Sequence, residues 1–310
     1  MRLVFLGTPA FAVPTLERAV AAGHQVAAVI TQPDRPRGRG QHAAPPPVKQ
    51  AALRLGLPVY QPERVRRPEA VDLLRSFAAE AMVVVGYGQI IPQTIIDLAP
   101  MGIINVHASL LPKYRGAAPI QWAILNGETC TGVTTMRIDA GLDTGDMLLE
   151  AETPIGPEET APELGERLAG LGADLLVRTL DGLARRTIVP RPQNPAEASY
   201  APLLKKEDGL IDWTRSAPGI HNQVRGLQPW PGAYTAFRGQ ALHVWRSKIT
   251  AAKSASGRFA SLKPLVVACG GETGLELVEV QLEGRKRISA ADFANGQRLN
   301  ENDMLGEKSI

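Results

Sequence analysis

Three polar residues, Asn105, His107 and Asp143, supply the side chains in this sequence that are best suited to chemistry. Ile103, Ile104 and Val106 predict a short buried strand. Asn105 and His107 are the polar residues that interrupt this apolar pattern. Because side chains alternate along a strand, an amide and an imidazole two positions apart should point to the same face. Open α/β sheets bind ligands at the carboxyl ends of their strands, so a carboxylate one supersecondary unit later can reach the same place. The set needs no nucleophilic Ser or Cys and suits transfer of an acyl group from a bound donor to an incoming amine.

Each of the three residues also has a structural interpretation. A histidine at the end of a strand can simply be hydrogen-bonded to its surroundings, and Asn105 can bond to neighbouring loop backbone. Asp143 stands between Gly141 and Gly145, where a carboxylate is typical of a tight turn. Taken singly, the residues leave both interpretations open.

The bulk composition indicates a globular protein of ordinary make-up. Its 310 residues are enough for two domains, and 44% hydrophobic and 21% charged residues fit a soluble chain. The net charge of +3 is small, but residues 1–208 carry 21 basic and 22 acidic side chains, whereas residues 209–310 carry 13 and 9. The basic excess in the last third favours a polyanionic partner there.

Cysteine usage and the N-terminus bear on the compartment. Cys130 and Cys269 fall in different expected domains and show no metal-ligand spacing, which suits a reducing compartment. The N-terminus runs directly into a strand, and no apolar run reaches transmembrane length. We therefore expect a cytoplasmic protein with no membrane association. Nothing in the sequence requires a metal or a dimer, so we expect neither, and a monomer is the default.

The first 30 residues predict a β-α-β unit with a right-handed parallel crossover. Residues 2–6 and 25–30 read as buried strands, and residues 12–22 as the helix between them. Gly7 is followed by Thr8 and Pro9, so the G-x-G-x-x-G fingerprint of dinucleotide-binding proteins is absent. The opening is Rossmann-like but argues against NAD binding.

Later apolar patterns continue a mostly parallel α/β domain, which we place at residues 1–188. They predict helices at 48–55, 69–77, 90–98, 117–126 and 164–183, and strands at 58–60, 82–85 and 131–138, the last with a hairpin partner at 146–150. Between the second strand and the next helix lies a proline-bounded loop that contains Arg35, Arg37 and Arg39. This loop is either a solvated surface segment or a basic arm that binds phosphate or nucleic acid.

Composition changes at residue 189. Residues 189–208 contain four prolines and no apolar period, so we expect an extended, semi-rigid interdomain linker. Beyond it, a short helix near 220–227 precedes strand patterns at 233–237, 241–249, 265–268 and 275–282, separated by glycines. A domain of this size and pattern, at residues 209–310, is expected to be a small OB-like β-barrel.

The motifs around the polar residues resemble a known superfamily. NVHASLLPKYRG, followed by DAGLDTGD, is similar to the folate-dependent formyltransferases. TQPDRPRGRG and NQVRGLQPWPGAYT extend the likeness, over nearly the whole chain, to the branch that acts on Met-tRNA. The resemblance implies transfer of formyl from 10-formyltetrahydrofolate to the α-amino group of methionine on initiator tRNA. Ala108 departs from the Gly or Pro that is common in the family, but it is a compatible small residue.

The same resemblance implies a role for each motif residue. Asp143 would remove a proton from the amine, and Asn105 and His107 would stabilise the tetrahedral oxyanion, at about 3 kcal/mol per donor. His107 would then protonate the departing folate nitrogen. The folate would be bound by Val84, Gly86, Tyr87, Ser109, Leu110, Leu111, Pro112 and Asp139. Arg39 would read the acceptor end of the tRNA, and the other tRNA contacts would come from Arg35, Arg37, Lys205, Lys206, Lys248, Arg285, Lys286 and Arg287.

Two other functions compete with this one. The same chemistry could act on a nucleotide-linked amino sugar or another small amine, because the NVH-SLLP core is shared across the superfamily. Alternatively, the chain could be a non-catalytic RNA-binding module built on the OB-like barrel. That second alternative leaves the grouping of Asn105, His107 and Asp143 without an explanation.

Overall fold

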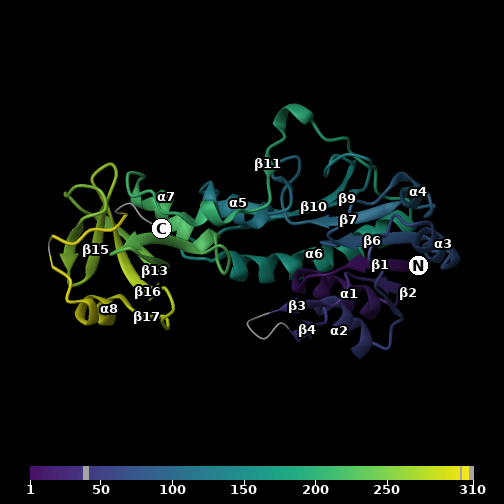
Figure 1. Cartoon of the computed structure of the whole chain (residues 1–310). Helices are drawn as coiled ribbons and strands as arrows, with labels where there is room; N and C mark the ends of the chain where they lie inside the picture. Colours follow the sequence, from purple (N-terminus) through teal and green to yellow (C-terminus); the bar gives the residue numbers. More distant parts are fainter. Residues whose placement is uncertain (38–41, 301, 307–310) are drawn as a thin grey trace. The chain divides into compact units, whose positions relative to one another are not determined.

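A computed structural model describes residues 1–37, 42–300 and 302–306 of the chain (Figure 1). The chain forms two compact units that each draw on several segments. Unit 1 comprises Met1–Pro119, Cys130–Pro154 and Gly165–Ala201; unit 2 comprises Ile120–Thr129, Ile155–Leu164 and Pro202–Ile310.

Unit 1 is built on a seven-stranded sheet with the strand order β10-β9-β7-β6-β1-β2-β5 (Figure 1). The central pairs are parallel, and β9 and β10 add an antiparallel edge. Apolar runs such as AMVVV in β6 are buried along their whole length, as expected where both faces of a sheet are covered. The predicted Rossmann-like domain is confirmed. Its strands are β1 (Arg2–Gly7), β2 (Gln25–Ile30), β5 (Val59–Tyr60), β6 (Ala81–Val85), β7 (Ile103–His107), β9 (Cys130–Arg137) and β10 (Met147–Pro154).

The helices of this part follow the predicted pattern, with shifted ends. They are η1 (Ala10–Ala12), α1 (Val13–Ala21), α2 (Pro47–Arg54), α3 (Pro68–Ser76), α4 (Gln93–Ile96), α5 (Pro119–Leu125) and α6 (Ala161–Ala184), with α5 and α6 each contributing residues to both units. The helix expected at 90–98 is confined to the single turn α4. Pro92 keeps its own backbone extended and disfavours helical geometry at the residue before it, so the helix cannot begin earlier.

Two segments expected to be irregular contain short strands. Within the arginine-bearing loop, β3 (Arg35–Arg37) and β4 (His42–Ala44) pair as an antiparallel hairpin. Residues 189–208, expected to be an extended linker, are instead attached to unit 1 as far as Ala201. After η2 (Pro195–Glu197), β11 (Tyr200–Ala201) pairs in parallel with β8 (Arg115–Gly116), in the loop that follows β7. Proline content predicted the extended backbone but not its pairing partner.

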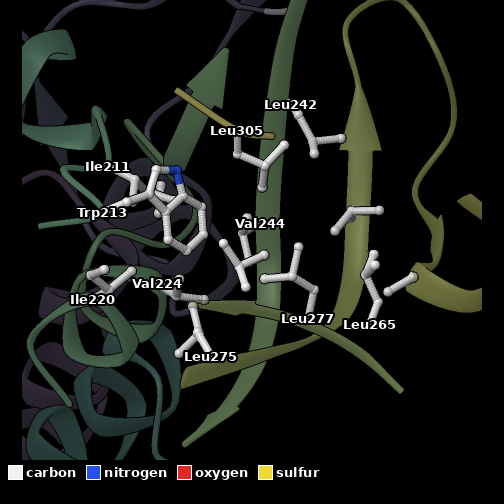
Figure 2. Close-up of a cluster of buried hydrophobic side chains, with 14 of the residues drawn as sticks. Ile211, Trp213, Ile220, Val224, Leu242, Val244, Leu265, Leu275, Leu277 and Leu305 are labelled. Carbon is white, nitrogen blue, oxygen red and sulfur yellow. The ribbon is translucent and has the colours of Figure 1, made fainter. Parts of the chain in front are cut away.

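Unit 2 is centred on an antiparallel sheet with the order β12-β13-β16-β15-β14, to which β17 adds through β16. Its elements are η3 (Lys206–Gly209), α7 (Ala217–Gly226), β12 (Ala233–Phe237), β13 (Gln240–Ala251), β14 (Phe259–Leu262), β15 (Leu265–Cys269), β16 (Thr273–Leu282), β17 (Ile288–Ser289) and α8 (Ala290–Gln297). Figure 2 shows its core, where Trp213 and Ile220 pack among aliphatic side chains of the strands. The small β domain predicted after the α/β domain is confirmed; β14, β17 and α8 were not foreseen.

Candidate active site

The structure brings Asn105, His107 and Asp143 together at the carboxyl end of β7. β7 lies between its parallel neighbour β6 and its antiparallel neighbour β9. The Asn105 side-chain nitrogen donates to Asp143 Oδ1 at 3.4 Å, and His107 Nδ1 lies 3.7 Å from Asp143 Oδ2. The alternation of the strand and the reach of the later loop therefore produce the predicted cluster. The chemical roles of the three residues are taken up under Proposed function.

The two ring nitrogens of His107 face different partners. Nε2 lies 2.9 Å from the backbone oxygen of Tyr114. Because a carbonyl can only accept, Nε2 carries a hydrogen and donates it. Nδ1 is then the nitrogen that faces Asp143. The side chain is only 7% exposed, so the ring is held in this orientation by its surroundings.

The loop that carries Asp143 is held in an unusual backbone conformation. Asp143 has a φ of +50°, in the left-handed region, which Asp and Asn tolerate better than most residues. Its Oδ2 accepts a hydrogen bond of 2.9 Å from the backbone N–H of Gly116. A Cβ on Gly145 would lie 2.0 Å from the backbone oxygen of Arg137, so only glycine fits there. These contacts aim the Asp143 carboxylate at the end of β7.

Asp139, expected to contact folate, is engaged within its own loop. Its carboxylate accepts from the Thr144 hydroxyl at 2.7 and 2.9 Å and from the Gly141 N–H at 3.0 Å. The side chain shapes the turn that leads to Asp143 and remains exposed to solvent. Any folate contact of Asp139 would use a carboxylate that is already hydrogen-bonded.

The Ser109–Pro112 segment, also expected at the folate site, is partly structural. Ser109 is fully buried, and its hydroxyl donates to the Lys113 backbone oxygen at 2.6 Å. Leu111 is buried against Met136 and Met147, and its N–H donates to the Thr134 hydroxyl at 3.1 Å. Leu110 and Pro112 are the members with partly exposed side chains.

The β6 turn presents backbone rather than side chains at the sheet edge. Tyr87 is 1% exposed, and its ring packs in the hydrophobic core with Val84. Burial raises the pKa of Tyr87 to about 12, and no described residue lies within hydrogen-bond distance of its hydroxyl. Its backbone oxygen accepts from the Thr8 hydroxyl at 3.0 Å and from the Gln32 amide at 3.1 Å. Gly86 is exposed. The groups that this turn can offer to folate are therefore the backbone atoms of Gly86 and Tyr87.

A pocket of about 460 Å³ lies at the carboxyl ends of β1, β2 and β6, and sequence analysis did not identify it. Its polar lining includes the Thr8 and Gln32 side chains, and Arg35 is the charged residue among the described residues that line it. Prolines of the 45–47 run and Gly88 form much of the rest. The signal was present in the sequence, since Gly7-Thr8-Pro9 and Thr31-Gln32-Pro33 each end a strand of a parallel sheet, where ligands bind.

The residues expected to bind tRNA fall into two groups. Arg35 lines the pocket and Arg37 ends β3, while Arg39 lies outside the described residues. The expected tRNA-binding residues of unit 2 all have exposed side chains: Lys205, Lys206, Lys248, Arg285, Lys286 and Arg287. Arg287 is already engaged, because its guanidinium lies 4.1 Å above the Trp245 ring and 3.6 Å from Glu279.

The described part of the chain offers neither a cluster of metal ligands nor a helix that could span a membrane. Residues 1–37, 42–300 and 302–306 contain no group of three or more His, Cys, Asp or Glu side chains that could hold a metal ion. Within the same residues, every helix is too short or too polar to cross a bilayer.

Comparison with known proteins gives a consistent result for both parts of the chain. A family model described as formyl transferase matches residues 1–180, and one described as formyl transferase, C-terminal domain, matches residues 203–298. A methionyl-tRNA formyltransferase of Solibacter usitatus is 73% identical over 309 residues, covering 99% of both chains. The corresponding protein of Koribacter versatilis is 58% identical over 311 residues, covering all of both chains.

Solved structures share the fold at much lower identity. An N-formyltransferase from Helicobacter canadensis, in complex with folinic acid and dTDP-3-aminofucose, aligns with a TM-score of 0.67 at 21% identity, covering 89% of this chain and 98% of that one. A methionyl-tRNA formyltransferase from Clostridium thermocellum aligns with a TM-score of 0.55 at 17% identity, covering 80% and 93%. At these identities the likeness concerns the fold alone. The family follows from the full-length relatives and the two matched family models: this chain belongs to the methionyl-tRNA formyltransferases.

Proposed function

We propose that this protein transfers the formyl group of 10-formyltetrahydrofolate to the α-amino group of the methionine carried by initiator Met-tRNA. The observation that carries the proposal is the grouping of Asn105, His107 and Asp143 at the end of β7, in a chain that is 73% identical to a named methionyl-tRNA formyltransferase. Because charged initiator tRNA is used in translation, the site of action would be the cytosol.

In this mechanism, the Asp143 carboxylate accepts the proton that the amine loses as its nitrogen attacks the formyl carbon. The carboxylate is held by Gly116 N–H and faces Asn105 and His107, so it is fixed rather than free to rotate. A fixed base of this kind typically contributes about 10²- to 10⁴-fold to the rate. The proton moves to Asp143 directly or through one water.

The oxygen of the formyl group gains negative charge as the carbon becomes tetrahedral. The Asn105 amide has two N–H donors, one of which is directed at Asp143, which leaves the other for this oxygen. His107 can contribute only through Nδ1, because Nε2 is bound to the Tyr114 carbonyl. The proton that Asp143 has taken from the amine passes to Nδ1, which lies 3.7 Å from Asp143 Oδ2. Nδ1 then donates this proton to the oxyanion and releases it to the folate nitrogen as the C–N bond to the donor breaks, which returns Asp143 and His107 to their starting states.

The pocket beside Thr8, Gln32 and Arg35 suits the acceptor. It lies at the same edge of the sheet as the end of β7, its proline walls are apolar, and Arg35 can contact a phosphate. We assign the methionyl end of the tRNA to this pocket and folate to the Gly86–Tyr87 backbone and to Leu110 and Pro112. In this scheme residues 1–188 catalyse, and the basic residues of 209–310 bind the tRNA backbone. Phosphate contacts of this kind make affinity fall steeply with salt.

Formylation of purified Met-tRNA with 10-formyltetrahydrofolate tests the proposal, with uncharged tRNA and free methionine as controls. Product confined to charged initiator tRNA would support the donor and the acceptor together. A nucleotide-linked amino sugar should be tried in the same assay. Formylation of that sugar without turnover of Met-tRNA would show that the sugar, not Met-tRNA, is the acceptor. If folded protein transferred formyl to neither, the enzyme function would be rejected.

A further inference from the structure

Gln193 belongs to the segment expected to be a linker, yet its side chain is buried against the Asp143 loop. It is 9% exposed, and every hydrogen-bonding group of its carboxamide has a partner. The side-chain oxygen accepts from Arg115 Nε at 3.0 Å and from an Arg115 terminal nitrogen at 2.6 Å. The side-chain nitrogen donates to the backbone oxygens of Asp143 and Gly145, each at 2.8 Å.

The orientation of this carboxamide is determined by its neighbours. Arginine has only donors, and backbone carbonyls have only acceptors. Rotating the amide by half a turn would place its NH₂ against the Arg115 guanidinium and its oxygen against two carbonyls. Arg115, itself 4% exposed, therefore fixes which way the Gln193 NH₂ points.

Gln193 lies in a strap, residues 191–201, that joins the two loops bearing the site. At one end, Arg191 and Met147 exchange backbone hydrogen bonds of 2.9 Å. Towards the other end, Ser199 accepts from Arg115 N–H through its backbone oxygen and from Tyr114 N–H through its hydroxyl, each at 2.9 Å. The loop that follows β7 and the loop that carries Asp143 are thus both hydrogen-bonded to the strap.

The geometry points to Gln193 and Arg115 as a positioning pair for Asp143. Asp143 has a left-handed backbone, and the Gln193 NH₂ holds the carbonyl on its C-terminal side together with that of Gly145. Without these two donors, the peptide after Asp143 can rotate and turn the carboxylate away from Asn105 and His107. The assignment rests on the proposed function, because it concerns the base of that reaction. Neither residue touches the reacting atoms.

The test is Gln193→Glu in the full-length protein. A glutamate keeps an acceptor for Arg115 and gains an ion pair, but it cannot donate to the two carbonyls. We expect kcat with Met-tRNA to fall about 10- to 100-fold, the loss typical of a reacting group displaced by up to 1 Å. KM for both substrates should stay near the wild-type values, and the thermal midpoint should fall by a few degrees, because the new carboxylate oxygen faces two carbonyls without a donor. Gln25→Glu, an exposed glutamine at the opposite end of the sheet, is the matched charge control.

Hydrogen–deuterium exchange provides a readout independent of activity. The peptide covering residues 139–147 should exchange faster in Gln193→Glu than in the wild type and in Gln25→Glu. Arg115→Lys, which keeps the charge but loses the fork, should show the same pattern and serves if Gln193→Glu does not fold. Unchanged exchange, or unchanged kcat with faster exchange, would overturn the positioning role. If the wild type does not formylate Met-tRNA, the proposed function fails, and exchange still decides whether Gln193 holds the loop.

Discussion

Replacing Asp143 by Asn separates its proposed role as a base from its role in the loop. An asparagine oxygen can still accept the hydrogen bond from Gly116 N–H, and asparagine tolerates the φ of +50° at this position. The asparagine NH₂ would then face Asn105, whose own amide can flip so that its oxygen accepts. The variant therefore keeps the fold of the loop; it removes the group that takes the proton and, through the flip, also turns the Asn105 NH₂ away from residue 143.

The expected loss is large in rate and small in stability. Removing a positioned general base typically costs about 10²- to 10⁴-fold in rate, which is about 3–5 kcal/mol of activation free energy. Asp143→Ala would lower the unfolding free energy as well as the rate. A left-handed backbone costs an alanine about 1 kcal/mol more than an asparagine, and the lost hydrogen bond to a carboxylate is worth about 1.5–3 kcal/mol of unfolding free energy. The Asn variant therefore separates the effect on rate from the effect on stability.

The assay is single-turnover formylation of Met-tRNA with both substrates saturating, alongside thermal unfolding of each protein. Asp97→Asn, an exposed aspartate at the end of α4, is the control for the change in charge. We expect Asp143→Asn to unfold within about 2 °C of the wild type, because the asparagine oxygen keeps the hydrogen bond from Gly116 N–H. A formylation rate within about threefold of the wild type would refute Asp143 as the base, because loss of a positioned base costs at least about 10²-fold.

Three further outcomes follow from the structure. Asn105→Ala should lower kcat about 10²- to 10³-fold, as loss of one oxyanion donor does; single-turnover rates check this, and a near-normal rate would contradict it. Gly116→Ala should lower the thermal midpoint by several degrees, because a Cβ there would lie 2.6 Å from the Ala201 oxygen at a φ of +122°; an unchanged midpoint would count against the β8–β11 contact. The raised pKa of Tyr87, about 12, favours its neutral form in the folded state, so its contribution to stability is present below about pH 10 and lost between about pH 10 and 12. Tyr87→Phe should therefore unfold less readily than the wild type in that range in urea titrations, and equal alkaline loss in both would refute this.

The strands of unit 1 could be predicted because their signal is local. A run such as AMVVV in β6 is apolar at every position, and the N-x-H spacing fixes that Asn105 and His107 share a face whatever the rest of the chain does. The effect of Pro92 on α4 is also local, because a proline disfavours helical geometry at the residue before it.

The contacts that complete the site could not be predicted, because they join residues far apart in the sequence. Nothing in the sequence around Gln193 indicates that its partners are Arg115 and the Asp143 carbonyl. The burial of Tyr87 could not be predicted either, because a glycine-flanked position at a strand end does not indicate that the ring packs in the core. The short β14 and β17 carry too few residues for periodicity to be read.

The strap has a consequence for how the protein is made. During synthesis, residues 1–143 leave the ribosome before the strap does, so the loop bearing Asp143 first exists without Gln193 and without the β8–β11 pair. At about 5–20 residues per second, translation from Asp143 to Ala201 takes about 3 to 12 seconds. Through that interval the sheet can form, and Asp143 can have its contact with Gly116 but not those of its loop with Gln193. Nascent chains that stop before residue 193 would carry Asn105, His107 and Asp143 yet lack the two hydrogen bonds from Gln193 to the backbone of the Asp143 loop.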